Sequence, residues 1–141
     1  MKTLDTNVVV RLLIGDDPQQ TPIAEQAFLD AISSGGVYLP DVVLAEVAWV
    51  LRSYDLERTT RYQLLERLVR TRGVVVDDID AVIDALEQFR LGGDLADQLI
   101  LARAASTGAL PVPCRCSALT VGSPPRQVWN CSAQVEVYTG R

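Results

Sequence analysis

Four carboxylates lie in sequence settings that suggest a chemical role. Asp5 directly follows a short apolar opening, and Glu46 lies in a segment that is apolar on most sides. Asp94 and Asp97 are three residues apart at an expected helix start, so they share one face near the positive end of that helix. An acid in such a setting requires a hydrogen-bond partner, a cation or a chemical role.

Hard oxygen ligands in a chain without His predict Mg²⁺ or Mn²⁺. Asp5 sits at the edge of an expected strand, where open α/β sheets gather ligands, and Asp94 and Asp97 would meet it there as a cation site. Such an ion contacts phosphate oxygens and activates a water for phosphodiester cleavage. Asn7 could orient Asp5 or a metal-bound water, and Glu46 could hold a water or act as a base.

Each acid also has an ordinary structural interpretation. Asp94 with Asp97 could be a helix N-cap followed by an acid in the first turn, and Asp5 could be a turn residue that accepts backbone N–H groups. Glu46 could mark the boundary of an amphipathic helix. The chemical interpretation is favoured because the four acids occur together. Arginines that could be a solvated helix face or could contact phosphates are Arg58, Arg61, Arg67, Arg70 and Arg72.

The elements that must position these residues alternate between strands and helices. Helical spacing of apolar residues predicts helices over 23–32, 42–54, 77–91 and 94–107, and a further helix that Thr59 or Thr60 caps and that directs the apolar residues of 64–69 inward. Apolar runs predict a strand region over 3–13, a short strand at 37–39, a buried strand at 74–76 and another strand at 109–112. This alternation predicts an α/β fold with a mainly parallel central sheet and helices on both faces.

The totals are those of one small domain. The chain has 141 residues, enough to bury a sizeable core. It lacks an apolar run of the roughly 18 residues that a membrane span needs, and Asp5 and Arg11 interrupt the N-terminus where a signal peptide would be apolar. We therefore expect a cytoplasmic protein. Without His, the cysteines could make at most an incomplete thiolate site; they are Cys114, Cys116 and Cys131.

Three segments together resemble a known family. LDTNVVVRLL at 4–13, LAEVAWVL at 44–51 and GDLADQLILA at 93–102 are similar to the three acidic motifs of PIN-domain ribonucleases, in particular the VapC toxins of bacterial toxin–antitoxin pairs. The resemblance covers residues 1–112 and implies a PIN-like three-layer fold. It places acidic family positions at Asp5, Glu46 and Asp97, a frequent extra acid at Asp94, and a polar pair at Thr6 and Asn7.

The resemblance implies a metal-dependent endoribonuclease toxin that uses Mg²⁺ or Mn²⁺, cleaves RNA, dimerises and binds a cognate antitoxin. We predict Asp5 and Asp97 as the direct metal ligands, with Asp94 and Glu46 acting mostly through water. We also predict a homodimer, because residues 42–51 and 64–69 carry more apolar surface than a small monomer usually buries.

Two other functions remain open at this point. An aspartyl phosphatase also places an Asp after its first strand, but it requires a second Asp two residues later, where this chain has Asn7. A catalytically impaired PIN-like module could bind an antitoxin without cutting RNA. The tail supports this alternative, because no acid occurs between Val112 and Glu136, and Cys116 stands near the place of the family's fourth carboxylate.

The tail departs from the rest of the chain in charge and pattern. Residues 1–112 hold ten Lys or Arg and 17 Asp or Glu, a net charge of −7, whereas residues 113–141 hold three Arg and one Glu, a net charge of +2. Reading the same bases from the third base of each codon permits Phe-Asp-Arg-Arg-Leu across 118–123 and Pro-Gly-Val-Glu-Leu-Leu across 126–132, which resemble the missing family segments. Our hypothesis is a PIN domain at 1–112 and a frame-shifted tail at 113–141, with irregular structure and weakened metal binding.

Overall fold

A computed structural model describes residues 1–109. The predictions made for the strand at 109–112 and for the tail fall outside the described residues. None of the helices in the described part is long and apolar enough to cross a membrane. In chain order the elements are β1 (Lys2–Thr3), α1 (Thr6–Ile14), α2 (Gln20–Ser33), β2 (Val37–Tyr38), α3 (Asp41–Val50), the 3₁₀ turn η1 (Leu51–Ser53), α4 (Arg58–Val69), β3 (Val74–Val75), α5 (Ile79–Arg90) and α6 (Leu95–Ser106).

The three strands form a parallel sheet in the order β1-β2-β3. The N–H of Val37 donates to the carbonyl of Gly73 at 2.8 Å. Gly36, at φ +103°, permits the close approach of the chains there, because a Cβ at this position would lie 2.8 Å from the same carbonyl oxygen. Since all strands run the same way, the residues that follow β1, β2 and β3 meet at one edge of the sheet.

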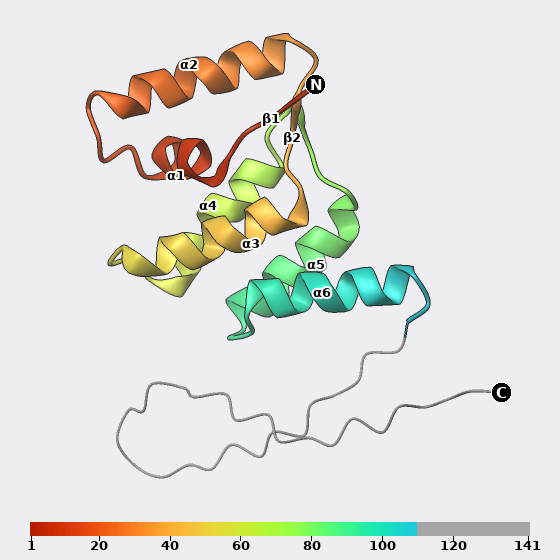
Figure 1. Cartoon of the computed structure of the whole chain (residues 1–141). Coiled ribbons are helices and arrows are strands. Elements are labelled where there is room, and N and C mark those ends of the chain that lie inside the picture. Colours follow the sequence, from red (N-terminus) through yellow and green to blue (C-terminus); the bar gives the residue numbers. More distant parts are fainter. Residues whose placement is uncertain (110–141) are drawn as a thin grey trace, which may run out of the picture. The chain divides into compact units, whose positions relative to one another are not determined.

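The helices pack around this sheet and bury one continuous core. α1 lies beside α2 and α5 beside α6, with α3 and α4 between the two pairs (Figure 1). Leu39 after β2, Leu44 and Val47 on α3, Leu65 on α4 and Leu86 on α5 are all essentially inaccessible to solvent. Strands and helices alternate as the sequence predicts, and the predicted α/β class is confirmed.

The strand region predicted over 3–13 is wrong beyond Thr3, because the Val-rich run that follows Asp5 is helix α1. Asp5 is its N-cap: Oδ1 accepts a hydrogen bond from the N–H of Val8 at 2.9 Å. Val9 and Val10 are buried on one side of this helix. Capping and packing therefore outweigh the preference of Val for strands.

Two smaller predictions are also wrong. α4 begins at Arg58 with Glu57 in the N-cap position, rather than at Thr59 or Thr60. Val75 is 43% exposed rather than buried, because β3 is at an edge of the described sheet. The helices expected at 23–32, 42–54, 77–91 and 94–107 are α2, α3 with η1, α5 and α6, and Gly108 follows α6 in the left-handed conformation at φ 73°.

Candidate active site

A hydrogen bond between two distant segments builds the first part of the site. Thr6, in the first turn of α1, is buried, and its Oγ1 donates to Oε2 of Glu46 at 2.6 Å. Glu46 itself is exposed on the outer side of α3. Because Thr6 directly follows Asp5, this bond holds the carboxylate of Glu46 near the carboxyl end of β1. Asn7 is exposed one residue further along α1.

The second part of the site is the start of α6, which packs against α3. Asp94 is the N-cap of this helix, and its Oδ1 accepts a hydrogen bond from the N–H of Ala96 at 2.9 Å. Its other oxygen lies 3.8 Å from Nη1 of Arg52. Asp97 is exposed in the first turn. Both acids therefore lie at the N-terminal end of α6, beside its first free N–H groups.

The structural interpretations hold for Asp5 and Asp94, both of which cap helices. The expected meeting of three carboxylates is not seen: within residues 1–109, no three Asp, Glu, Cys or His side chains lie close enough to hold one ion. The donor chemistry still fits Mg²⁺ or Mn²⁺, since Asp5 and Glu46 each use one oxygen in the contacts above and Mg²⁺ is commonly held by one or two carboxylates and several waters. The direct ligation predicted for Asp5 and Asp97 stays a prediction.

Arg58 hydrogen-bonds to the loop that precedes α6. Its Nη1 donates to the carbonyl of Phe89 at 2.7 Å and to the carbonyl of Gly93 at 2.8 Å. Its guanidinium also lies 5.0 Å from the centre of the Phe89 ring. Arg58 thus joins the start of α4 to the end of α5 and to the residue before Asp94, which makes it a positioning residue for the start of α6.

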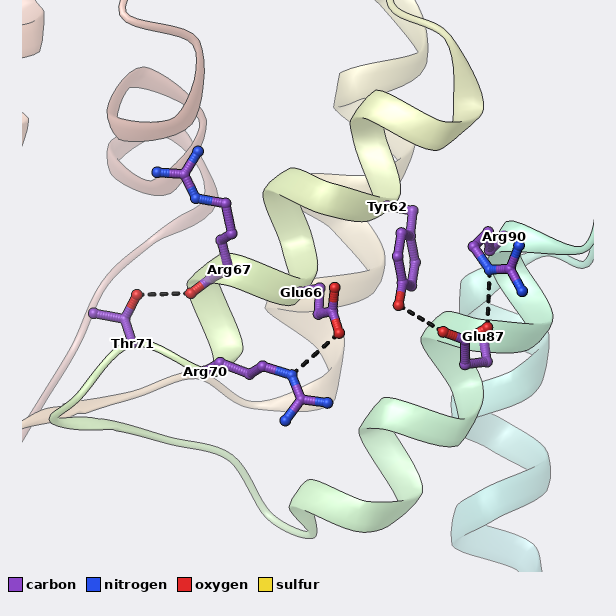
Figure 2. A network of polar contacts seen from close by, with 7 residues as sticks. All are labelled: Tyr62, Glu66, Arg67, Arg70, Thr71, Glu87 and Arg90. Atoms are coloured by element: carbon purple, nitrogen blue, oxygen red, sulfur yellow. Dashed lines mark hydrogen bonds and ion pairs between the residues drawn. The ribbon is translucent and has the colours of Figure 1, made fainter.

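The run of arginines divides into two groups along α4. Arg67 in the last turn, Arg70 at the C-cap and Arg72 just beyond it are all exposed, and Nε of Arg70 pairs with Glu66 at 3.1 Å (Figure 2). This end precedes β3 and so lies opposite the carboxyl edge of the sheet. With 1.5 Å of rise per residue, Arg58 and Arg70 are separated by about 18 Å along the helix. Contact of these arginines with RNA stays a prediction.

Comparison with known families decides what this chain is. The family model of the PIN domain matches residues 2–110. The chain belongs to the PIN domain family. Membership implies a nuclease-type function, and PIN-domain nucleases generally use divalent metal ions. Comparisons with curated proteins and with solved structures return no match.

In this PIN domain, Arg103 anchors α6 at a second point that the sequence did not reveal. Its Nε donates to Oδ2 of Asp41, the first residue of α3, and its Nη2 lies 3.3 Å from Oδ2 of Asp77 after β3. The hydroxyl of Tyr38 donates to Asp77 as well. The hydrogen bond to Asp41 raises the pKa of Arg103. Asp41 and Asp77 both follow strands, so the parallel topology could have indicated that they meet.

A further polar network links α4 to α5 (Figure 2). The hydroxyl of Tyr62, a buried residue, donates to Oε1 of Glu87 at 2.6 Å, and Nε of Arg90 donates to Oε2 of Glu87 at 2.9 Å. The hydrogen bond to Glu87 raises the pKa of Tyr62 to about 12, and the same bond lowers the pKa of Glu87. This network stabilises the scaffold on which Arg58 and Phe89 meet.

Proposed function

We propose that this PIN domain is a metal-dependent endoribonuclease, the VapC-type toxin of a toxin–antitoxin pair, which cleaves RNA phosphodiester bonds with a metal-activated water. The main support is the bond from Thr6 to Glu46, which joins the first two acidic motifs beside Asp5 at the carboxyl end of β1. The third motif forms the start of α6, and α6 packs against α3. Hard oxygen donors at this edge suit Mg²⁺ or Mn²⁺.

The residues have separate roles in this proposal. Asp5 and Asp97 hold the ion, which supplies the activated water and neutralises developing negative charge when bound. Glu46 and Asp94 act through water, Glu46 in the orientation that Thr6 sets. Asn7 supports Asp5.

The proposed partners are an RNA substrate, a cognate antitoxin and a second copy of the chain, in the cytoplasm. Much of the apolar surface expected to form a dimer is used inside the chain, since Leu44, Val47 and Leu65 are buried in its own core. Val42, 69% exposed on α3, remains available for a homodimer contact. Light scattering of the full chain at micromolar concentration measures the oligomeric state.

The second candidate is a module that binds an antitoxin without cutting RNA. It is favoured by the separation of the acids within residues 1–109, and by the absence of an acid in the sequence from 113 to 135. Cleavage separates the two candidates, because this module would bind its antitoxin and leave RNA intact.

The test is cleavage of a labelled single-stranded RNA by the full chain, with Mg²⁺ or Mn²⁺ and with chelator. We expect metal-dependent cleavage that Asp97→Asn abolishes while its circular dichroism spectrum is unchanged. Asp80→Asn, an exposed acid in the first turn of α5, is the matched control and should cleave normally. Calorimetric titration with Mn²⁺ gives a second readout, in which only Asp97→Asn should weaken binding. Full activity of Asp97→Asn would refute the assignment.

A further inference from the structure

The outer face of α3 and η1 carries three functional side chains at intervals of three residues. Glu46, held by Thr6, is followed by Trp49 and Arg52. Trp49 is 69% exposed, and the side chain of Arg52 is 61% exposed. Residues three apart on a helix lie on the same side. A large exposed aromatic ring therefore stands between a carboxylate of the proposed catalytic site and the exposed guanidinium of Arg52.

Positive charge gathers beside the ring of Phe89, which lines the same hollow as Trp49. The guanidinium groups of Arg58 and Arg61 lie 5.0 Å and 5.9 Å from the centre of the Phe89 ring. Nε of Arg61 is buried without a hydrogen-bond partner among the described residues. Burial lowers the pKa of Arg61, and repulsion from Arg58 and Arg52 lowers it further. The acid nearest Arg52 is Asp94, at 3.8 Å and exposed, where an ion pair contributes little.

Trp49 and Arg52 belong to one surface, and Arg61 adjoins it through the ring of Phe89. Trp49 and Arg52 from α3 and η1, Phe89 from α5 and Asp94 from the start of α6 line the same hollow of about 60 Å³. This volume holds a few waters and is too small for a nucleobase. A ligand on this surface would therefore lie across the exposed ring of Trp49, with Arg52 on one side and Glu46 on the other.

We propose that Trp49, Arg52 and Arg61 form a track for single-stranded RNA that leads to the acids of the proposed site. One base stacks on Trp49, and the neighbouring phosphates contact the guanidinium groups of Arg52 and Arg61. This inference rests on the proposed ribonuclease function and adds where the RNA lies. Aromatic rings that stack on bases, set in a cationic groove, are how proteins bind single strands without sequence preference.

Charge complementarity favours RNA over a second copy of this chain as the occupant. The net charge of −5 repels a second copy of the chain as it does RNA, but the arginines Arg52, Arg58 and Arg61 are a local concentration of positive charge that attracts the phosphates of a polyanion. The exposed Trp49 ring has Glu46 and Arg52 on its own helix face, and the apolar residues that line the hollow beside it on α3 are only the small Ala45 and Ala48. The other exposed apolar residue on α3, Val42, lies two turns away.

Binding of a fluorescein-labelled 12-nucleotide single-stranded RNA to the full chain, in chelator, tests the track without cleavage. We expect Trp49→Ala to weaken binding about tenfold, since stacking contributes roughly that much per base, and Trp49→Phe to restore most of it. Ile23→Ala, which removes an equally exposed apolar side chain from α2, should leave binding unchanged. In a Trp129→Phe background, Trp49 becomes the one tryptophan, and its fluorescence should be quenched by RNA.

The salt dependence of binding tests the two phosphate contacts. Each lost contact to a single strand reduces the slope of log K against log salt by about 0.7. We expect this reduction for Arg52→Ala and for Arg61→Ala. Arg72→Ala removes the same charge before β3, at the opposite edge of the sheet, and should change the slope less.

Two results would overturn the track. The first is RNA binding by Trp49→Ala and Arg52→Ala at the wild-type affinity. The second is a change in oligomeric state for Trp49→Ala by light scattering, with RNA affinity per subunit unchanged, which would make Trp49 a contact between copies. A different result would refute the proposed function and leave the track in place: the wild-type chain would bind RNA through Trp49 and Arg52 but would not cleave it with Mg²⁺ or Mn²⁺.

Discussion

Replacement of Arg58 by Ala should destabilise the domain more than replacement of any other arginine on α4. The substitution removes hydrogen bonds to the carbonyls of Phe89 and Gly93, at 2.7 and 2.8 Å, and the contact with the Phe89 ring. With about 1 kcal/mol for each bond at this half-buried site, and about 0.5–1 kcal/mol for the cation–π contact, the free energy of unfolding should fall by about 2–3 kcal/mol. For a domain of this size the melting temperature should fall by roughly 10 °C.

Urea unfolding followed by circular dichroism measures this loss, and the slope with denaturant should stay constant. Arg58→Lys should recover part of the stability, because one ammonium lacks the planar fork that serves two carbonyls and stacks on a ring. Arg70→Ala is the matched control: its ion pair with Glu66 is exposed, so its loss should change stability by less than about 0.5 kcal/mol. The positioning role of Arg58 is refuted if Arg58→Ala and Arg70→Ala unfold at the same urea concentration.

Three further predictions concern the Tyr62 network, the Thr6 bond and the tail. The pKa of Tyr62 in the folded state is raised to about 12, so its contribution to stability is present below pH 10 and is lost as the pH rises from 10 to about 12. Urea titrations at several pH values should show that the free energy of unfolding of Tyr62→Phe falls less over this range than that of the wild type. Thr6→Val keeps the shape but removes the bond to Glu46, so RNA cleavage should fall tenfold or more with a nearly unchanged melting temperature, and undiminished cleavage would count against the role of Glu46. Sequencing the gene tests the frame hypothesis: an Asp encoded across codons 119 and 120 in the shifted frame is expected, and a frame-restored chain should bind Mn²⁺ more tightly and cleave RNA faster.

Local patterns were enough to predict most of the elements, but not the first helix. Apolar residues recur at helical spacing in α2, α5 and α6, and glycines mark where two of these helices end. By composition the Val-rich run after Asp5 favours a strand. Its conformation depends on the cap made by Asp5 and on the bond from Thr6 to a residue 40 positions away, which no local pattern contains.

The candidate site was predictable in its residue types and less so in its geometry. The order of the acidic motifs indicated the family that the match over residues 2–110 confirms. The distances between the acids depend on how helices pack, and the sequence offered no means to predict that three of them remain apart within residues 1–109. Arg58 illustrates the same limit, because its partners are backbone carbonyls 31 and 35 positions away, and any residue type supplies a carbonyl.

The anchoring of α6 bears on the choice between a nuclease and a binding module. Arg58 holds the residue before its N-cap, and Arg103 ties its other half to Asp41 and Asp77. All of these residues precede position 110, where the family match ends. A change in the tail, such as a shifted frame would make, therefore does not replace the residues that anchor Asp94 and Asp97. We expect that restoring the frame raises metal affinity without altering the Arg58 or Arg103 contacts.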